Sequence, residues 1–114
     1  MNITQAKEIL EEQFGFIAED ANNTVQYLKL PSDAKILDVG TGKGYFAIVL
    51  ALNGYSISTG EPESDNSIYA KKDWLGNSQK VSVDHLIKFH AFDSRDMPFD
   101  DNSFDAIFFE CNQN

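Results

Sequence analysis

The chain has 114 residues, of which 42% are hydrophobic and 24% charged, with a formal net charge of −9. This length suits one domain with one core, and no apolar run approaches the roughly 20 residues that cross a bilayer. The acidic balance disfavours nucleic acid as a partner, because it repels phosphate backbones. One cysteine, Cys111, excludes an intramolecular disulfide and a cysteine metal cluster, and fits a reducing cytoplasm.

Residues 1–31 predict an N-terminal helical segment. Apolar side chains recur at helical spacing within 4–14 and again within 18–28. Gly15 is expected to separate the two helices, and Pro31 to end the second. The first residues lack the basic and apolar regions of a secretory signal.

The rest of the chain alternates between strand-like and helix-like patterns. Strands are expected at 35–39, 55–59, 87–92 and 104–109, the last as a continuous buried apolar run, and helices at 45–52 and from 62 to about 75. Gly76-Asn77-Ser78 is expected to break the latter helix. The stretch 77–84 reads as an insertion, in which Val81 and Val83 could form a short strand. Such alternation predicts a parallel sheet with helices, which binds ligands beyond the carboxyl ends of its strands.

A glycine-rich turn follows the first predicted strand and opens a helix. Gly40, Gly42 and Gly44 stand at alternate positions, with Thr41 between the first two and Asp38 just before them. Glycine permits a tight turn and close approach of a ligand to the backbone, and the helix N-terminus adds exposed amides.

Two other nucleotide motifs fit this turn less well. A P-loop would need glycine at Leu37 and Ser or Thr at Gly44, and is rejected. A dinucleotide fingerprint would need its third glycine at Tyr45, and stays open as a weaker alternative.

Glu61 lies 21 residues after Gly40, at the end of the second predicted strand. A carboxylate there can accept hydrogen bonds from both hydroxyls of a ribose, as in adenine dinucleotide sites. Glu61 therefore indicates an adenosine ligand without identifying it. The alternative is a solvated acid, since Glu63 and Asp65 stand nearby.

The run from Asp93 to Asp105 discriminates best between the possible classes of adenosine-binding protein. It resembles the Asp-x-x-x-Leu-Pro-Phe-x-x-x-Ser-Phe-Asp run of class I S-adenosylmethionine-dependent methyltransferases, with Met97 in place of leucine. The Asp-x-Gly-x-Gly-x-Gly sequence that begins at Asp38 resembles the first motif of the same family. Dinucleotide dehydrogenases do not typically carry a run like that from Asp93 to Asp105. This run therefore favours a methyltransferase over a dinucleotide enzyme.

This resemblance, over about 35–110, implies an α/β fold: a Rossmann-like parallel sheet, truncated after about the fourth strand, in a single domain spanning 1–114. It implies S-adenosylmethionine as the cofactor. The glycine turn with Asp38 would lie against its methionine and ribose portion, and Glu61 would hold the ribose hydroxyls. The remaining contacts that it implies are Pro62 on the adenine face, Asp93 and Ser94 on the adenine edge, and Glu110 near the methionine end.

The implied activity is methyl transfer to an acceptor that the sequence does not identify, with a small molecule favoured over nucleic acid and no catalytic residue assigned. His85 and His90 lack a third ligand at a convincing spacing, so no metal is expected. The alternatives are a non-catalytic cofactor-binding or assembly module, and another adenosine-cofactor enzyme such as an aminopropyltransferase or a dehydrogenase. Strand 104–109 would be central in this family; as an exposed edge it predicts a homodimer or larger assembly.

Overall fold

The computed structural model describes residues 1–40, 43–61, 74–91 and 103–109. The elements follow one another as α1 (Ile3–Ile9), α2 (Glu12–Leu28), β1 (Ile36–Val39), α3 (Tyr45–Leu52), β2 (Ile57–Glu61), α4 (Trp74–Lys80), the 3-10 helix η1 (Asp84–Leu86), β3 (Ile87–Ala91) and β4 (Ala106–Phe109).

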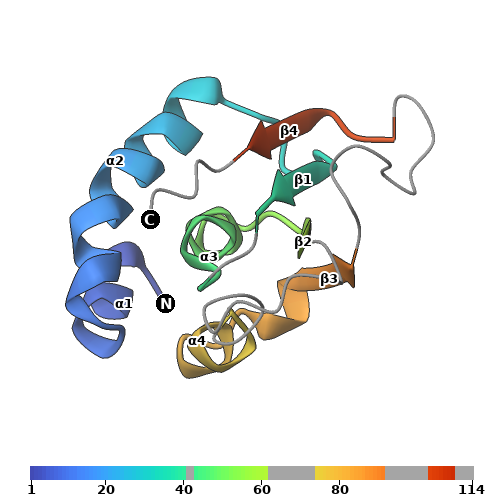
Figure 1. Cartoon of the computed structure of the whole chain (residues 1–114). Coiled ribbons are helices and arrows are strands. Elements are labelled where there is room, and N and C mark those ends of the chain that lie inside the picture. The colour runs from blue at the N-terminus through green and yellow to red at the C-terminus, as the bar shows by residue number, and fades with distance from the viewer. Residues whose placement is uncertain (41–42, 62–73, 92–102, 110–114) are drawn as a thin grey trace.

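The four strands form one sheet in the order β3-β2-β1-β4, and every neighbouring pair is parallel. The chain proceeds outward from β1 through β2 to β3, and then returns to the other side of β1 as β4 (Figure 1). The predicted parallel α/β sheet is confirmed. The direction of strand addition reverses at β1, and α/β sheets bind ligands at such a reversal.

The core lies between the sheet and α3. Ile36, Ile57 and Ile87 are register partners across β1, β2 and β3, and all three belong to the buried cluster that includes the apolar side chains of α3. The helices α2 and α4 pack against α3 in turn. The apolar run Tyr45–Leu52 is therefore a buried helix, as predicted.

The strand β4 is less buried than its apolar sequence predicted. Phe108 faces the core, where its ring centroid lies 4.8 Å from that of Phe46 in α3. Ile107 and Phe109 point the other way and are 44% and 65% exposed. The prediction that β4 is a buried strand was therefore wrong for one of its two faces. Among the described residues, helical packing covers only the face that carries Phe108.

The boundary between the first two helices also differs from the prediction. The break falls at Leu10, which adopts an extended backbone and buries its side chain in the core. Gly15 lies inside α2, beside the fully buried Phe14. Burial of apolar anchors on both sides of the break outweighs the low helix propensity of glycine. The helix α2 ends at Leu28, and its C-cap Lys29 has a left-handed backbone, shortly before Pro31.

Gly76-Asn77-Ser78 lies within α4 and does not break a helix. The Asn77 amide donates to the Lys43 carbonyl at 3.0 Å, and the Ser78 hydroxyl donates to the Leu75 carbonyl at 2.9 Å. The following residues form no strand: Val81 and Val83 are core residues of the connection into η1. The predicted insertion thus contributes buried side chains to the core, while Gln79, Lys80 and Ser82 are exposed. The expected start of this helix, at Pro62, falls outside the described residues.

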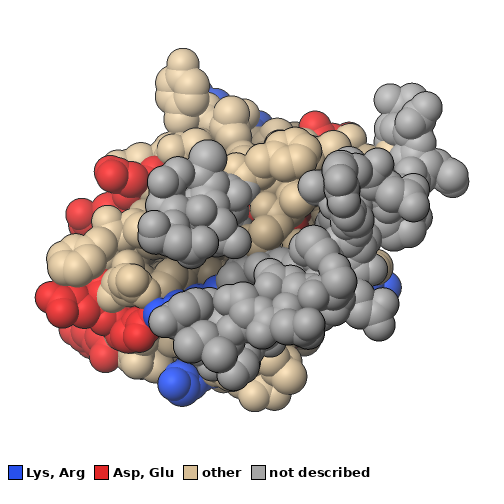
Figure 2. Space-filling model, in the orientation of Figure 1, with Lys and Arg blue, Asp and Glu red and all other residues tan. Residues whose placement is uncertain are grey.

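Acidic side chains gather over α1 and α2 (Figure 2), where the exposed residues Glu8, Glu11, Glu12, Glu19 and Asp20 lie. This surface carries much of the net negative charge. In the described part of the chain, no helix is long and apolar enough to span a membrane.

The surroundings of Gly44, Gly54 and Gly15 predict that alanine at each position changes the free energy of unfolding by a different amount. Gly44 has φ +80, and an added Cβ would lie 2.8 Å from Trp74 Cβ and 3.0 Å from Trp74 Cα. We expect Gly44→Ala to lower the free energy of unfolding by at least about 2 kcal/mol, because strain and collision add. Gly54→Ala has the strain (φ +94) without a collision and should cost about 1 kcal/mol.

Gly15→Ala is the matched control, since it lies in a helix and an added Cβ meets nothing within 4 Å. It should raise the free energy of unfolding by up to about 1 kcal/mol. Urea titrations of the three variants measure these differences. Equal effects at positions 44 and 54 would contradict the close packing of α4 on the turn.

Candidate functional site

The carboxyl ends of β1, β2 and β3 lie side by side. Gly40 follows β1 with φ 97, and its amide donates to the Gly60 carbonyl at 2.9 Å. Gly60 directly precedes Glu61, the last residue of β2, and Glu61 pairs with Ala91 at the end of β3. The start of the glycine turn is thus bonded to the backbone beside the predicted ribose acid.

Asp38 is fully buried within β1, opposite Thr59 of β2. The Thr59 hydroxyl donates to the Asp38 carboxylate at 2.9 Å. A fully buried carboxyl group without a hydrogen-bond donor would destabilise the fold, so this bond offsets part of the cost of burying Asp38. The bond joins β1 to β2 two residues before the glycine turn begins.

Gly44 ends the turn as the N-cap of α3. The sequence predicted glycine here for close approach of a ligand, and the structure supplies a second reason, which is the contact with Trp74. The indole of Trp74 stacks on Phe89 of β3, with ring centroids 5.7 Å apart. Position 44 therefore sets how closely α4 approaches the turn.

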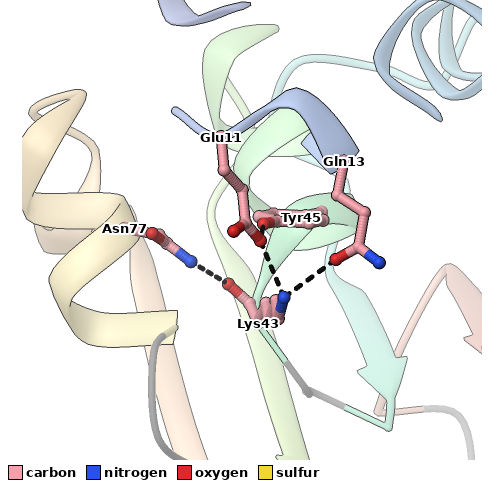
Figure 3. A network of polar contacts seen from close by, with 5 residues as sticks. All are labelled: Glu11, Gln13, Lys43, Tyr45 and Asn77. Carbon is pink, nitrogen blue, oxygen red and sulfur yellow. Dashed lines mark hydrogen bonds and ion pairs between the residues drawn. The ribbon is translucent and has the colours of Figure 1, made fainter. Parts of the chain in front are cut away.

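A polar network around Lys43 was not predicted from the sequence. The Lys43 ammonium lies 2.7 Å from a Glu11 carboxylate oxygen and 2.8 Å from the Gln13 side-chain oxygen (Figure 3). The Tyr45 hydroxyl donates to the same Glu11 oxygen. Hydrogen bonds from Lys43 and Tyr45 lower the pKa of Glu11 below its usual 4.5. No motif joins residues so distant in the chain, so only the fold reveals this network.

The predicted site residues fall into two groups. The structure brings together Asp38, Gly40, Gly44 and the backbone of Glu61 at one edge of the sheet. The others lie outside the described residues: Thr41, Gly42, Pro62, Asp93, Ser94 and Glu110. Among the residues that are described, no group of three His, Cys, Asp or Glu side chains could hold a metal ion.

A hollow of about 540 Å³ lies at the opposite edge, where Ile36, Ile57 and Ile87 begin their strands. It is lined in part by Lys35, His85 and Lys88, which were not predicted as site residues, and is therefore distinct from the carboxyl edge.

Comparison with known proteins identifies the class. Residues 37–112 match the family described as methyltransferase domain, and residues 17–56 match protein-L-isoaspartate(D-aspartate) O-methyltransferase. Human EEF1A lysine methyltransferase 2 is 32% identical over 100 residues, which cover 81% of this chain and 42% of that protein. The chain thus spans less than half the length of this curated relative.

Solved structures share the fold. A Methanococcus maripaludis protein assigned as an S-adenosyl-L-methionine-dependent methyltransferase superposes with a TM-score of 0.72 at 24% identity, over 97% of this chain and 51% of that one. The [4+2]-cyclase SpnF superposes with a TM-score of 0.64 at 22% identity, over 79% of this chain and 32% of that one. The chain belongs to the class I S-adenosylmethionine-dependent methyltransferase family, whose cofactor is S-adenosylmethionine.

The described residues fit this cofactor. Gly40 has the positive φ that glycine adopts without strain at a tight turn, and its bond to Gly60 puts the start of that turn next to the residue before Glu61. An adenosine ligand needs such an arrangement, with amides near one part and a carboxylate near its ribose.

Two conservative substitutions of Thr59 test its hydrogen bond to Asp38. Thr59→Val keeps the shape but removes the hydroxyl, so the free energy of unfolding should fall by about 2 kcal/mol. Thr59→Ser keeps the hydroxyl and should lose less than half of that amount. Urea unfolding monitored by circular dichroism measures both. A large loss in Thr59→Ser with little or no loss in Thr59→Val would mean that the methyl group, and not the hydrogen bond, stabilises this pair of strands.

Proposed function

We propose that this chain binds S-adenosylmethionine at the carboxyl edge of its sheet and serves methyl transfer as the cofactor-binding part of a methyltransferase. The observation that carries the proposal is the hydrogen bond from Gly40 to Gly60. It brings the glycine turn beside Glu61 where strand addition reverses at β1. The proposed domain spans 1–114, with 1–31 as its helical segment and 35–110 as its Rossmann-like core.

Each proposed contact has its own chemical basis. Turn residues 40–44, with Asp38 behind them, would lie against the methionine and ribose portion, and Glu61 would accept from the ribose hydroxyls. Ala91 pairs with Glu61 at the end of β3, and Asp93 and Ser94 follow Ala91 closely in the sequence. Those two residues would read the adenine edge, Pro62 would cover its face, and Glu110 would lie near the methionine end.

S-adenosylmethionine itself supplies the activated methyl group when bound. The residues of the chain bind it, orient it and exclude water. No nucleophilic side chain is required for this role, and none is assigned.

For the acceptor, a small molecule or a protein is favoured over nucleic acid, because a net charge of −9 opposes binding to phosphate. The human relative is named as a lysine methyltransferase, which favours a protein lysine as one candidate class. A single cysteine in 114 residues supports a cytoplasmic location.

A second candidate is a chain that binds the cofactor without transferring its methyl group. The likeness to SpnF, whose name describes a cyclase, supports it, since the shared fold does not by itself imply methyl transfer. Methyl transfer from labelled S-adenosylmethionine to protein or small-molecule acceptors would favour the first candidate. Cofactor binding without transfer to any acceptor class would favour the second.

Calorimetric titration with S-adenosylmethionine and S-adenosylhomocysteine tests the proposed site. We expect both to bind, and Glu61→Ala and Asp93→Ala each to weaken binding by about tenfold or more, because each loses hydrogen bonds to a charged group. Glu63→Ala is the matched control and should bind as the unmodified chain does. Circular dichroism should show that all three variants fold. Binding of NAD alone, or unchanged affinity in both acid variants, would contradict the site.

We also propose a homodimer or larger assembly through β4. Ile107 and Phe109 are exposed, and within the described residues β4 has a strand on one side only. Sedimentation equilibrium should show self-association, and Ile107→Lys with Phe109→Lys should weaken it by removing the apolar contact. A monomer across the whole concentration range would contradict this assembly.

A further inference from the structure

Lys43 is held at both ends by elements outside the glycine turn (Figure 3). Its backbone carbonyl accepts from the Asn77 amide of α4 at 3.0 Å. Its ammonium donates to Glu11 at 2.7 Å and to Gln13 at 2.8 Å, both at the start of α2. Because Lys43 directly precedes Gly44, these contacts restrain the last part of the turn from two sides.

The contacts from the N-terminal segment converge on Glu11. One oxygen of its carboxylate accepts from Lys43 and also from Tyr45, the first residue of α3. The Lys43 ammonium in turn lies 6.0 Å from the centroid of the Tyr45 ring. Glu11 therefore joins the start of α2 to the turn and to the helix that the turn opens.

Glu11 is a poor N-cap residue for the stability of α2. Glu11 is the N-cap of α2, yet its side chain makes no hydrogen bond to that helix. Ser, Thr, Asp and Asn are the residues that cap a helix well. The helix α1 shows the usual solution, since Asn2 and Gln5 bond reciprocally in a capping box. The Glu11 carboxylate is directed to Lys43 instead of its own helix.

We propose that Glu11 is a positioning residue of the cofactor site, acting through Lys43 to restrain Lys43 and Gly44, the end of the glycine turn that opens α3. The inference rests on the proposed function, because it assigns a role in cofactor affinity. A restrained turn loses less conformational freedom when the cofactor binds, so affinity rises without a direct contact. The N-terminal helices thereby contribute to cofactor affinity.

The test is calorimetry with S-adenosylhomocysteine on four forms of the chain: unmodified, Glu11→Gln, Lys43→Met and the double variant. Each single substitution should weaken affinity by about threefold, the scale of a partly exposed ion pair. The double variant should bind no more weakly than Lys43→Met, because Lys43→Met already removes the ion pair with Glu11 together with the contact to Gln13. Losses that multiply in the double variant would overturn the proposal.

Glu11→Ser separates positioning from stability. Serine can cap α2, so the thermal midpoint of the unliganded variant should equal or exceed that of the unmodified chain. Its affinity for S-adenosylhomocysteine should nevertheless fall as in Glu11→Gln. Affinity equal to that of the unmodified chain in both variants would overturn the proposal.

Glu19→Gln is the matched control. It removes the other ion pair between described residues, Lys7 to Glu19 at 3.4 Å, which joins α1 to α2 away from the turn. Its affinity should be unchanged, and a loss equal to that of Glu11→Gln would overturn the specific role of Glu11. An unmodified chain that binds no S-adenosylhomocysteine would overturn the proposed function and this inference with it, whereas normal binding with unaffected Glu11 variants overturns the inference alone.

Discussion

The buried bond between Thr59 and Asp38 is the constraint on which the arrangement of this molecule depends. A carboxylate with no exposed surface requires a hydrogen-bond donor, and Thr59 supplies one from the neighbouring strand at 2.9 Å. The bond fixes β2 against β1 just before the chain leaves the sheet. Gly40 then turns, and its amide bonds to Gly60 one position beyond Thr59. The place where strand addition reverses is therefore fixed by two bonds between the same pair of strands.

The packing of α3 and α4 follows from this anchored turn. Gly44 opens α3, whose apolar side chains fill the core, and it has no Cβ that would collide with Trp74 of α4. The Asn77 amide bonds to the carbonyl of the residue before it. The described residues of the turn, Gly40, Lys43 and Gly44, thus contact β2, α4 and the start of α2. A ligand that binds at the carboxyl edge meets backbone already restrained from several sides.

The sequence could predict those features that depend on local patterns. The strand Ile36–Val39, the buried helix Tyr45–Leu52 and the parallel sheet were predicted correctly, because each rests on apolar patterning and glycine chemistry within a short stretch. Gly15 and Gly76-Asn77-Ser78 were interpreted wrongly as helix breaks, because tertiary packing outweighed their propensity. Glu11 and Lys43 could not be paired, since they lie far apart in the chain and only the folded α2 brings them together. The cofactor contacts expected of Asp93 and Ser94 remain predictions.

The central claim is that S-adenosylmethionine binds where the ends of β1 and β2 meet. Amide chemical-shift mapping with S-adenosylhomocysteine tests it most directly, because each backbone amide reports on its own surroundings. We expect the largest shifts at Gly40, Gly44 and Glu61, with small shifts around the hollow at the amino ends of the strands. Largest shifts at Lys35, His85 and Lys88, which line that hollow, would contradict the account.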